Sequence, residues 1–167
     1  MINPWRKIYD LPESVNPWEF LSEGTSIDFA LYLDVEPTNH CNMNCAFCVA
    51  KQQMKRPKDY MDIKLFEEIC KQAEKFGSKG IRFLRWGEPL LHKQIDKMII
   101  MAKDHKQLTH ITTNGFFLDD NMCVKLIEAG LDSIIISMQG TNEGEYSKLR
   151  GSQFETIADN VERLRKI

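Results

Sequence analysis

Apolar residues recur along this chain with two different spacings, and the two kinds of segment alternate. Over residues 62–76 they stand three or four positions apart, which places them on one face of a helix, and Gly77 follows where such a helix would end. Over residues 29–36 apolar and polar side chains alternate singly until Pro37 ends the run. Single alternation is typical of a strand. The pattern therefore predicts a strand followed by an amphipathic helix.

The same alternation continues to the end of the chain. Strands are predicted over 81–85, 108–113 and 133–137, and helices over 90–104, about 120–129, 143–149 and 154–166. Strands that alternate with helices form an α/β fold whose parallel sheet has right-handed crossovers. We therefore expect about four βα units in a sheet that closes toward a barrel or stays open, with sites at the C-terminal strand ends.

Two regions are predicted along the chain. Residues 1–28 are interpreted as an irregular lead-in with two short helical starts, at Asn3-Pro4-Trp5 and Asn16-Pro17-Trp18, because Asn caps a helix and Pro suits its first turn. Residues 29–167 form the core domain.

One face of the predicted strands is polar. Asp34 alternates with apolar neighbours, and His110 and Thr112 fall on one side of their strand. A strand buried on both faces would be apolar throughout. The polar face indicates a cavity for a polar ligand; the alternative is that these residues lie at strand ends near solvent.

Composition narrows the classes of partner. The chain has 167 residues, 43% of them hydrophobic, and a net charge of −2. This charge gives no reason to expect nucleic acid or an anionic membrane as partner. There is no secretory signal at the N-terminus, and the apolar runs are far shorter than the roughly 20 residues that span a bilayer. We therefore expect a cytoplasmic protein.

Cysteine supplies the main chemical signal. Three of the five cysteines, Cys41, Cys45 and Cys48, fall within eight residues, and an odd count argues against a disulfide framework. Thiolates at this spacing suit an iron–sulfur cluster with one iron left open. The alternative is a structural zinc site, which needs four ligands; His40 is a poor fourth because it adjoins Cys41. The two remaining cysteines fall on apolar helix faces and are predicted to be core residues: Cys70 and Cys123.

Further motifs follow in a fixed order. The three cysteines have the spacing Cys-x3-Cys-x2-Cys, with Phe47 before the last. Gly87-Glu88-Pro89 follows the second strand, Thr113-Asn114-Gly115 the third and Ser137–Gly140 the fourth, before Tyr146 and Arg150. This ordered set resembles the radical S-adenosylmethionine (radical SAM) superfamily, and within it the branch that carries a C-terminal cysteine-rich extension of the SPASM or twitch type. Trp86 stands where the family often has a glycine.

The resemblance implies a fold, two cofactors and a role for each matched residue. The fold is a partial TIM-type barrel, and the cofactors are a 4Fe–4S cluster and S-adenosylmethionine. The cysteines would hold three irons, Phe47 would lie against adenine, and Gly87, Glu88 and Pro89 would meet the methionine amine. Asn114 and Ser137 would contact ribose or methionine. Arg150 would pair with the methionine carboxylate, because its forked donors suit a carboxylate. For Gln139 two alternatives remain open: a contact with the ligand or a position on the surface.

The implied activity is that of a radical SAM enzyme: reductive cleavage of S-adenosylmethionine to a 5′-deoxyadenosyl radical that removes hydrogen from an unknown substrate. The family core has six strand–helix units and four are counted here, so we expect an incomplete core. The alternative function is a catalytically inactive iron–sulfur binding or electron-transfer fragment that needs a second chain to complete the barrel.

The expected partners follow from charge and from the same branch. Four basic residues come after the cysteines and suit an acidic electron donor such as flavodoxin or ferredoxin: Lys51, Lys55, Arg56 and Lys58. The alternative is an ordinary solvated loop. The branch indicates a peptide or protein substrate, although the C-terminal extension of the branch is not in this sequence.

Overall fold

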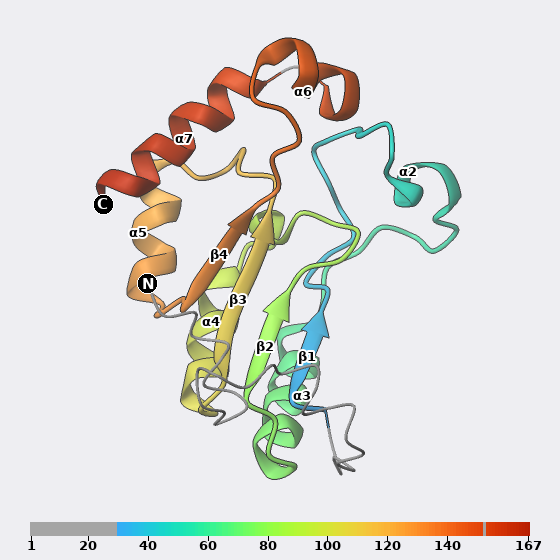
Figure 1. Cartoon of the computed structure of the whole chain (residues 1–167). Helices are drawn as coiled ribbons and strands as arrows, with labels where there is room; N and C mark the ends of the chain where they lie inside the picture. Colours follow the sequence, from blue (N-terminus) through green and yellow to red (C-terminus); the bar gives the residue numbers. More distant parts are fainter. Residues whose placement is uncertain (1–29, 152) are drawn as a thin grey trace, which may run out of the picture.

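A four-stranded parallel sheet forms the centre of the molecule (Figure 1). The structure is a computed structural model that describes residues 30–151 and 153–167. The strands are β1 (Tyr32–Val35), β2 (Gly80–Phe83), β3 (Leu108–Thr113) and β4 (Ser133–Ile136), and they lie side by side in chain order. Each strand pairs in parallel with the one before it, so the predicted α/β fold is confirmed.

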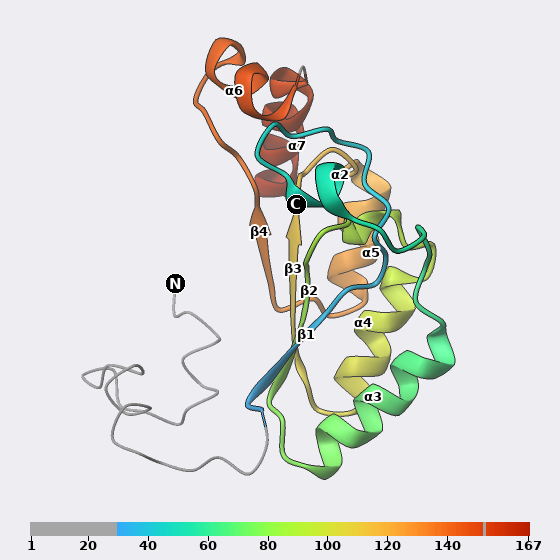
Figure 2. The same ribbon diagram turned by 90° about the vertical axis from the view of Figure 1, so that its right-hand side faces the viewer.

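The connecting helices lie on one face of this sheet. Helices α3 (Ile63–Lys75), α4 (Ile95–Asp104) and α5 (Asp120–Glu128) all cover the same side (Figure 2). No helix of the described residues covers the opposite face. Chain-order strands with helices on one side are the arrangement of a (βα) barrel wall, whereas a doubly wound sheet has helices on both faces. The structure is therefore a partial TIM-type barrel, a choice that the sequence pattern had left open.

The main core lies between the sheet and these helices. Phe66 and Cys70 of α3 are completely buried against Ile81 and Phe83 of β2. The rings of Phe66 and Phe83 lie 5.6 Å apart. Asp62 begins α3 by accepting hydrogen bonds from the backbone N–H groups of Lys64 and Leu65. The helix therefore presents its predicted apolar face to the sheet, and Cys70 and Cys123 are core residues as expected.

Several observed elements differ from the predicted ones. The first strand, predicted over 29–36, extends over Tyr32–Val35 among the described residues. The helix predicted over 90–104 is divided into a 3-10 turn, η2 (Pro89–Leu91), and α4, because the His92 ring nitrogen accepts the Gln94 N–H at 3.2 Å and the backbone there leaves the helical path. The second strand lies earlier than 81–85, since the chain leaves the sheet before Arg85, which has a positive φ of 129°. A short helix, α2 (Val49–Gln53), interrupts the predicted cysteine loop.

The loops at the C-terminal ends of the strands gather on one edge of the sheet. There the cysteine loop, α2 and the C-terminal helices α6 (Glu143–Arg150) and α7 (Phe154–Lys166) lie beyond the strand arrowheads (Figure 2). The predicted lead-in over 1–28 lies outside the described residues. Among the described residues, no helix is both long and apolar enough to cross a membrane.

Candidate functional site

The three clustered cysteines line one cavity of about 230 Å³ at the C-terminal edge of the sheet. Each thiol is partly buried. The loop turns tightly after Cys45, whose carbonyl accepts the Cys48 N–H at 3.1 Å, and Cys48 begins α2. Burial raises the pKa of the Cys41 thiol, and the negative charges of Glu88, Cys45 and Cys48 raise it further. These groups therefore share one electrostatic environment.

Three thiols lining one cavity are the donor chemistry that iron–sulfur clusters take. Among the described residues, no group of three or more His, Cys, Asp or Glu side chains is arranged to hold a single metal ion. A structural zinc site needs a fourth ligand, and the His40 ring instead stacks on Tyr60 with centroids 4.5 Å apart. The cavity therefore suits a cluster held by three thiolates.

Glu88 lines the same cavity. Its side chain is 2% exposed and accepts three hydrogen bonds: from the Leu90 N–H at 3.1 Å, the Thr113 hydroxyl at 2.6 Å and the Asn114 N–H at 2.8 Å. Desolvation raises the pKa of Glu88, and these donors and the charge of Arg150 oppose that rise. A buried carboxylate at this wall is suited to a cationic group in the cavity.

Gly87 lets the chain pass directly against the start of the cysteine loop. A Cβ at this position would lie 1.9 Å from the Thr38 carbonyl oxygen, so only glycine fits. The Glu88 N–H donates to the His40 carbonyl at 2.7 Å. Pro89 begins η2 behind the wall and does not line the cavity. The Gly-Glu-Pro motif thus joins the second strand end to the cysteine loop.

The other predicted residues enter the cavity from β3, β4 and α6. The Asn114 amide donates to Asn42 Oδ1 in the cysteine loop at 2.8 Å. Ser137 follows β4 and donates its N–H to the Thr113 carbonyl at 2.8 Å. The Arg150 guanidinium lies 5.5 Å from the centroid of the Phe47 ring and bonds to Gln139. Apart from Pro89, every predicted site residue therefore lines this one cavity.

Sequence reasoning missed several residues of the wall. Met43 and Thr113 line the cavity, as do Leu84, Arg85 and Thr112. Thr113 stands inside a motif that had been noticed, but its buried hydroxyl gave no separate signal. In the sequence, only the position of Met43 as an apolar residue inside a polar loop could have indicated that it lines the site. Trp86 also lines the cavity.

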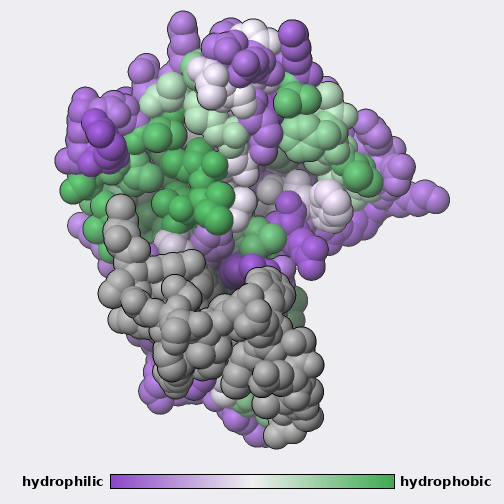
Figure 3. All heavy atoms as spheres, viewed as in Figure 1, coloured by the Kyte–Doolittle hydropathy of each residue, from purple (hydrophilic) through white to green (hydrophobic). Residues whose placement is uncertain are grey.

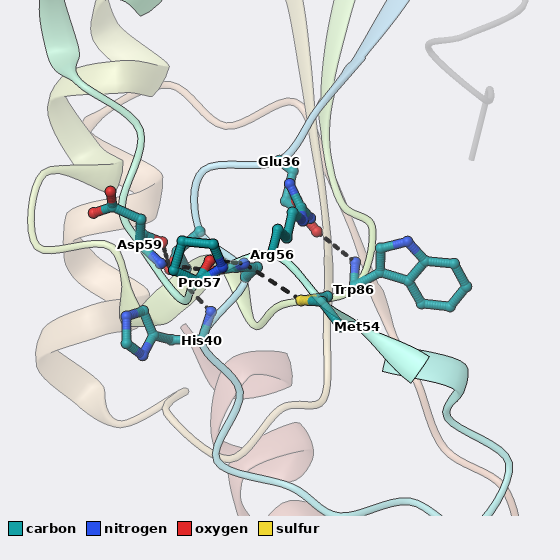
Figure 4. Close-up of polar contacts among 9 residues, drawn as sticks. Glu36, His40, Met54, Arg56, Pro57, Asp59 and Trp86 are labelled. Atoms are coloured by element: carbon teal, nitrogen blue, oxygen red, sulfur yellow. Dashed lines mark hydrogen bonds and ion pairs between the residues drawn. The ribbon is translucent and has the colours of Figure 1, made fainter. Parts of the chain in front are cut away.

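A network of side chains fixes the base of the cysteine loop (Figure 4). Glu36, just after β1, accepts the Trp86 N–H at 2.9 Å and pairs with Arg56. The Asn39 amide donates to the Pro57 carbonyl at 2.9 Å, and its oxygen accepts the Asp59 N–H at 2.7 Å. The segment that returns from α2 is therefore tied to the start of the loop.

A second cavity of about 220 Å³ lies on the other side of the cysteines. It shares the three cysteines, Met43 and Trp86 with the first, but its remaining wall carries the basic residues Lys51, Arg56 and Lys58. The cysteines thus stand between a wall that contains Glu88 and a wall that is basic.

The polar face predicted for the strands is present as one row across the sheet. Asp34, Arg82, His110 and Ser133 are register neighbours on β1 to β4. The Arg82 Nε–H donates to Asp34 at 2.6 Å, and His110 and Ser133 lie within 2.7 Å. His110 also reaches Thr112, a cavity residue, at 3.0 Å. The row therefore continues directly into the cavity.

A family comparison decides the class of this site. The sequence model of the Radical SAM superfamily matches residues 35–167. The chain belongs to the radical SAM superfamily. The cofactors of this family are a 4Fe–4S cluster and S-adenosylmethionine, as the resemblance had implied.

Relatives within the radical SAM superfamily are longer than this chain. A GTP 3′,8-cyclase of Clostridium botulinum is 31% identical over 137 residues, which cover 79% of this chain and 42% of the relative. The tungsten-containing aldehyde ferredoxin oxidoreductase cofactor-modifying protein of Pyrococcus furiosus is 38% identical over 108 residues, 64% of this chain and 30% of the relative. The chain thus spans less than half the length of these relatives.

Solved radical SAM structures share the fold. SuiB of Streptococcus suis bound to S-adenosylmethionine is 23% identical with a TM-score of 0.73, over 89% of this chain and 34% of SuiB. BtrN in complex with AdoMet and 2-DOIA is 25% identical with a TM-score of 0.62, over 80% of this chain and 56% of BtrN. Because SuiB is only 23% identical to this chain, its similarity shows a shared fold and nothing more.

Proposed function

We propose that this chain holds a 4Fe–4S cluster on Cys41, Cys45 and Cys48 and cleaves S-adenosylmethionine reductively to generate a 5′-deoxyadenosyl radical. The observation that supports it is that one cavity is lined both by the three thiols and by Glu88, Asn114, Ser137 and Arg150. When bound, the reduced cluster supplies the electron that breaks the sulfur–carbon bond, and the radical then removes hydrogen from the substrate.

The residues of the wall would bind and orient the cofactor. An ionised carboxylate has about four acceptor sites, and Glu88 uses three of them on protein donors, which leaves one for the methionine ammonium. Arg150 would pair with the methionine carboxylate, and Phe47 would lie against adenine, largely through its backbone. Asn114 and Ser137 would bond to ribose or methionine. Burial in the cavity strengthens each of these contacts.

The substrate would meet the polar row on the open face of the sheet. We propose a peptide or protein substrate, since a SuiB structure is described with its precursor peptide bound. GTP is the second candidate, because the Clostridium botulinum relative is a GTP 3′,8-cyclase and because Arg82 and Arg85 both pair with Asp34. Calorimetric titration of the reconstituted protein with GTP, with Arg82→Gln as control, separates the two.

Electron paramagnetic resonance on anaerobically reconstituted and reduced protein tests the proposed function. We expect a 4Fe–4S signal that shifts when S-adenosylmethionine is added, because the cofactor binds the open iron. A signal that ignores S-adenosylmethionine would contradict cofactor binding and favour the alternative, a catalytically inactive iron–sulfur or electron-transfer module. Copurification of a second chain would favour the version of that alternative in which a partner completes the barrel.

An acidic electron donor of the flavodoxin or ferredoxin type would dock at the basic cavity beside α2. Trp86 of this cavity and Val49 of α2 are both more than 40% exposed, and apolar residues gather on the α2 side of the surface in Figure 3. A charged rim around exposed apolar residues is suited to a transient partner of opposite charge.

Charge reversal on this surface tests the docking proposal. Arg56 is unsuitable because it is paired with Glu36, which also holds Trp86. We therefore choose Lys55→Glu with Lys58→Glu, and expect reduction by flavodoxin to slow about tenfold while reduction by dithionite is unchanged. Lys166→Glu, on the exposed end of α7, is the matched control. Equal slowing with both reductants would contradict a docking role.

A further inference from the structure

Helix α6 lies against the cysteine loop, although about a hundred residues separate the two along the chain. The Ala46 N–H of the loop donates to the Leu149 carbonyl of α6 at 2.8 Å. Glycines flank the helix, and both have positive φ angles: 120° at Gly140 and 95° at Gly151. Glycine allows the chain to turn sharply at both ends of α6, and the helix packs against α7 as well as against the loop.

Met43 makes the central contact between α6 and the loop. It lies between Cys41 and Cys45, two residues from each, and is 5% exposed. Its side chain forms a small second core with Tyr146 of α6 and Ile157 of α7, both completely buried. This core also touches Cys41 and Cys45. A change in the path of the cysteine loop must therefore displace Met43 and, with it, Tyr146, because close-packed side chains transmit displacement.

The Met43 thioether is also in contact with two polar groups of α6. Its Sδ lies 3.9 Å from the Tyr146 hydroxyl oxygen and 3.9 Å from Arg150 Nη1. Thioether sulfur is a weak acceptor, so these contacts add orientation more than energy. Arg150 is thus surrounded by Met43, by the Phe47 ring of the loop, and by Gln139 of the segment before α6. Two of its three neighbours belong to the cysteine loop.

We propose that Met43 is a positioning residue that joins the cysteine loop to α6, so that loading of the cluster on the loop sets the position of Arg150 in the cofactor cavity. The proposal rests on the proposed function for the identity of the cluster and of the carboxylate that Arg150 meets. The new element is a coupling between cluster loading on the cysteine loop and the position of Arg150. Such a coupling is reciprocal: what orders the loop orders α6, and what loosens α6 loosens the loop.

Amide hydrogen exchange measures the first half of the coupling without any turnover. We expect exchange of residues 143–150 to slow about tenfold when the apoprotein is loaded with the cluster. In Met43→Ala the slowing should be lost while iron per chain is retained, and Met98→Ala, which removes the same side chain from the main core, should keep it. Unchanged exchange of α6 on loading of the wild-type chain would overturn the proposal even if Met43→Ala does not fold. Failure of the wild-type chain to take up iron would instead overturn the proposed function.

Ligand affinity measures the second half. Met43→Ala should weaken binding of S-adenosylmethionine about tenfold but change binding of decarboxylated S-adenosylmethionine less than twofold, because that ligand lacks the group that Arg150 would meet. Arg150→Gln should show the same selective loss. Equal weakening of both ligands by Met43→Ala would mean a merely structural role for Met43 and overturn the proposal. If Arg150→Gln weakened the binding of both ligands equally, Arg150 would not contact the methionine carboxylate, and that part of the proposal would be overturned. The hydrogen-exchange result on α6 would not be affected.

Discussion

Glu88 shows how one residue serves the chemistry and the architecture of the site together. Its carboxylate faces the cavity, yet three donors from η2 and from the end of β3 converge on it. A buried carboxylate is stable only when such donors replace water. Thr113 and the backbone of Asn114 are therefore as necessary to the wall as Glu88 itself.

Thr113 provides the test of this point. Its hydroxyl donates to Glu88 at 2.6 Å and accepts the Gly115 N–H at 3.1 Å. Thr113→Val keeps the shape but removes both bonds inside the protein, so we expect the free energy of unfolding to fall by about 2 kcal/mol. Urea denaturation measures it. Thr113→Ser, which keeps the hydroxyl, is the control, and a valine variant as stable as the serine variant would contradict the role.

At the scale of elements, the site lies at the C-terminal ends of the strands. Contacts near the N-terminal ends of β3 and β4 hold these two strands in register. Asp132 precedes β4 and accepts hydrogen bonds from the Thr109 N–H at 2.7 Å and the Thr109 hydroxyl at 3.0 Å. It also pairs with Lys103 of α4. Since Thr109 is completely buried, Asp132 fixes β4 against β3 and so places Ser137 beside Thr113.

Removal of this carboxylate should therefore be costly for stability. Asp132→Ala leaves the buried Thr109 donor without its partner, and we expect the free energy of unfolding to fall by about 2 kcal/mol. Asp104→Ala, at the exposed end of α4, should change it by less than about 0.5 kcal/mol. Thermal or urea unfolding of both variants checks this. An Asp132 variant as stable as the Asp104 variant would show that the register is held elsewhere.

At the scale of the whole molecule, the helices cover one face of the sheet and leave a polar row on the other, so that the cavity opens onto that row. The five cysteines fall into two groups by their location. Cys41, Cys45 and Cys48 line the cavity, whereas Cys70 and Cys123 are completely buried in the core between sheet and helices.

This division predicts two classes of cysteine variant. Cys45→Ala should lose the cluster after anaerobic reconstitution, because two thiolates remain where three are needed. Cys70→Ala should retain it, with only a modest loss of stability from the small cavity left in the core. Iron content per chain and visible absorbance measure both. If Cys70→Ala also lost its iron while folded, the assignment of the three ligands would be wrong.

The sequence by itself determined the alternation of strands and helices, the parallel sheet and the family, because each depends on local spacing. β3 and α7 have the predicted bounds, and the motifs stand at the ends of successive strands. It did not determine the break between η2 and α4, where the His92 ring nitrogen takes up the Gln94 N–H. It also could not show that the helices of residues 30–151 and 153–167 all leave one face of the sheet uncovered, nor that Met43 meets Tyr146 and Arg150. Those depend on contacts between segments up to about a hundred residues apart, and such contacts leave no mark on the periodicity of either segment.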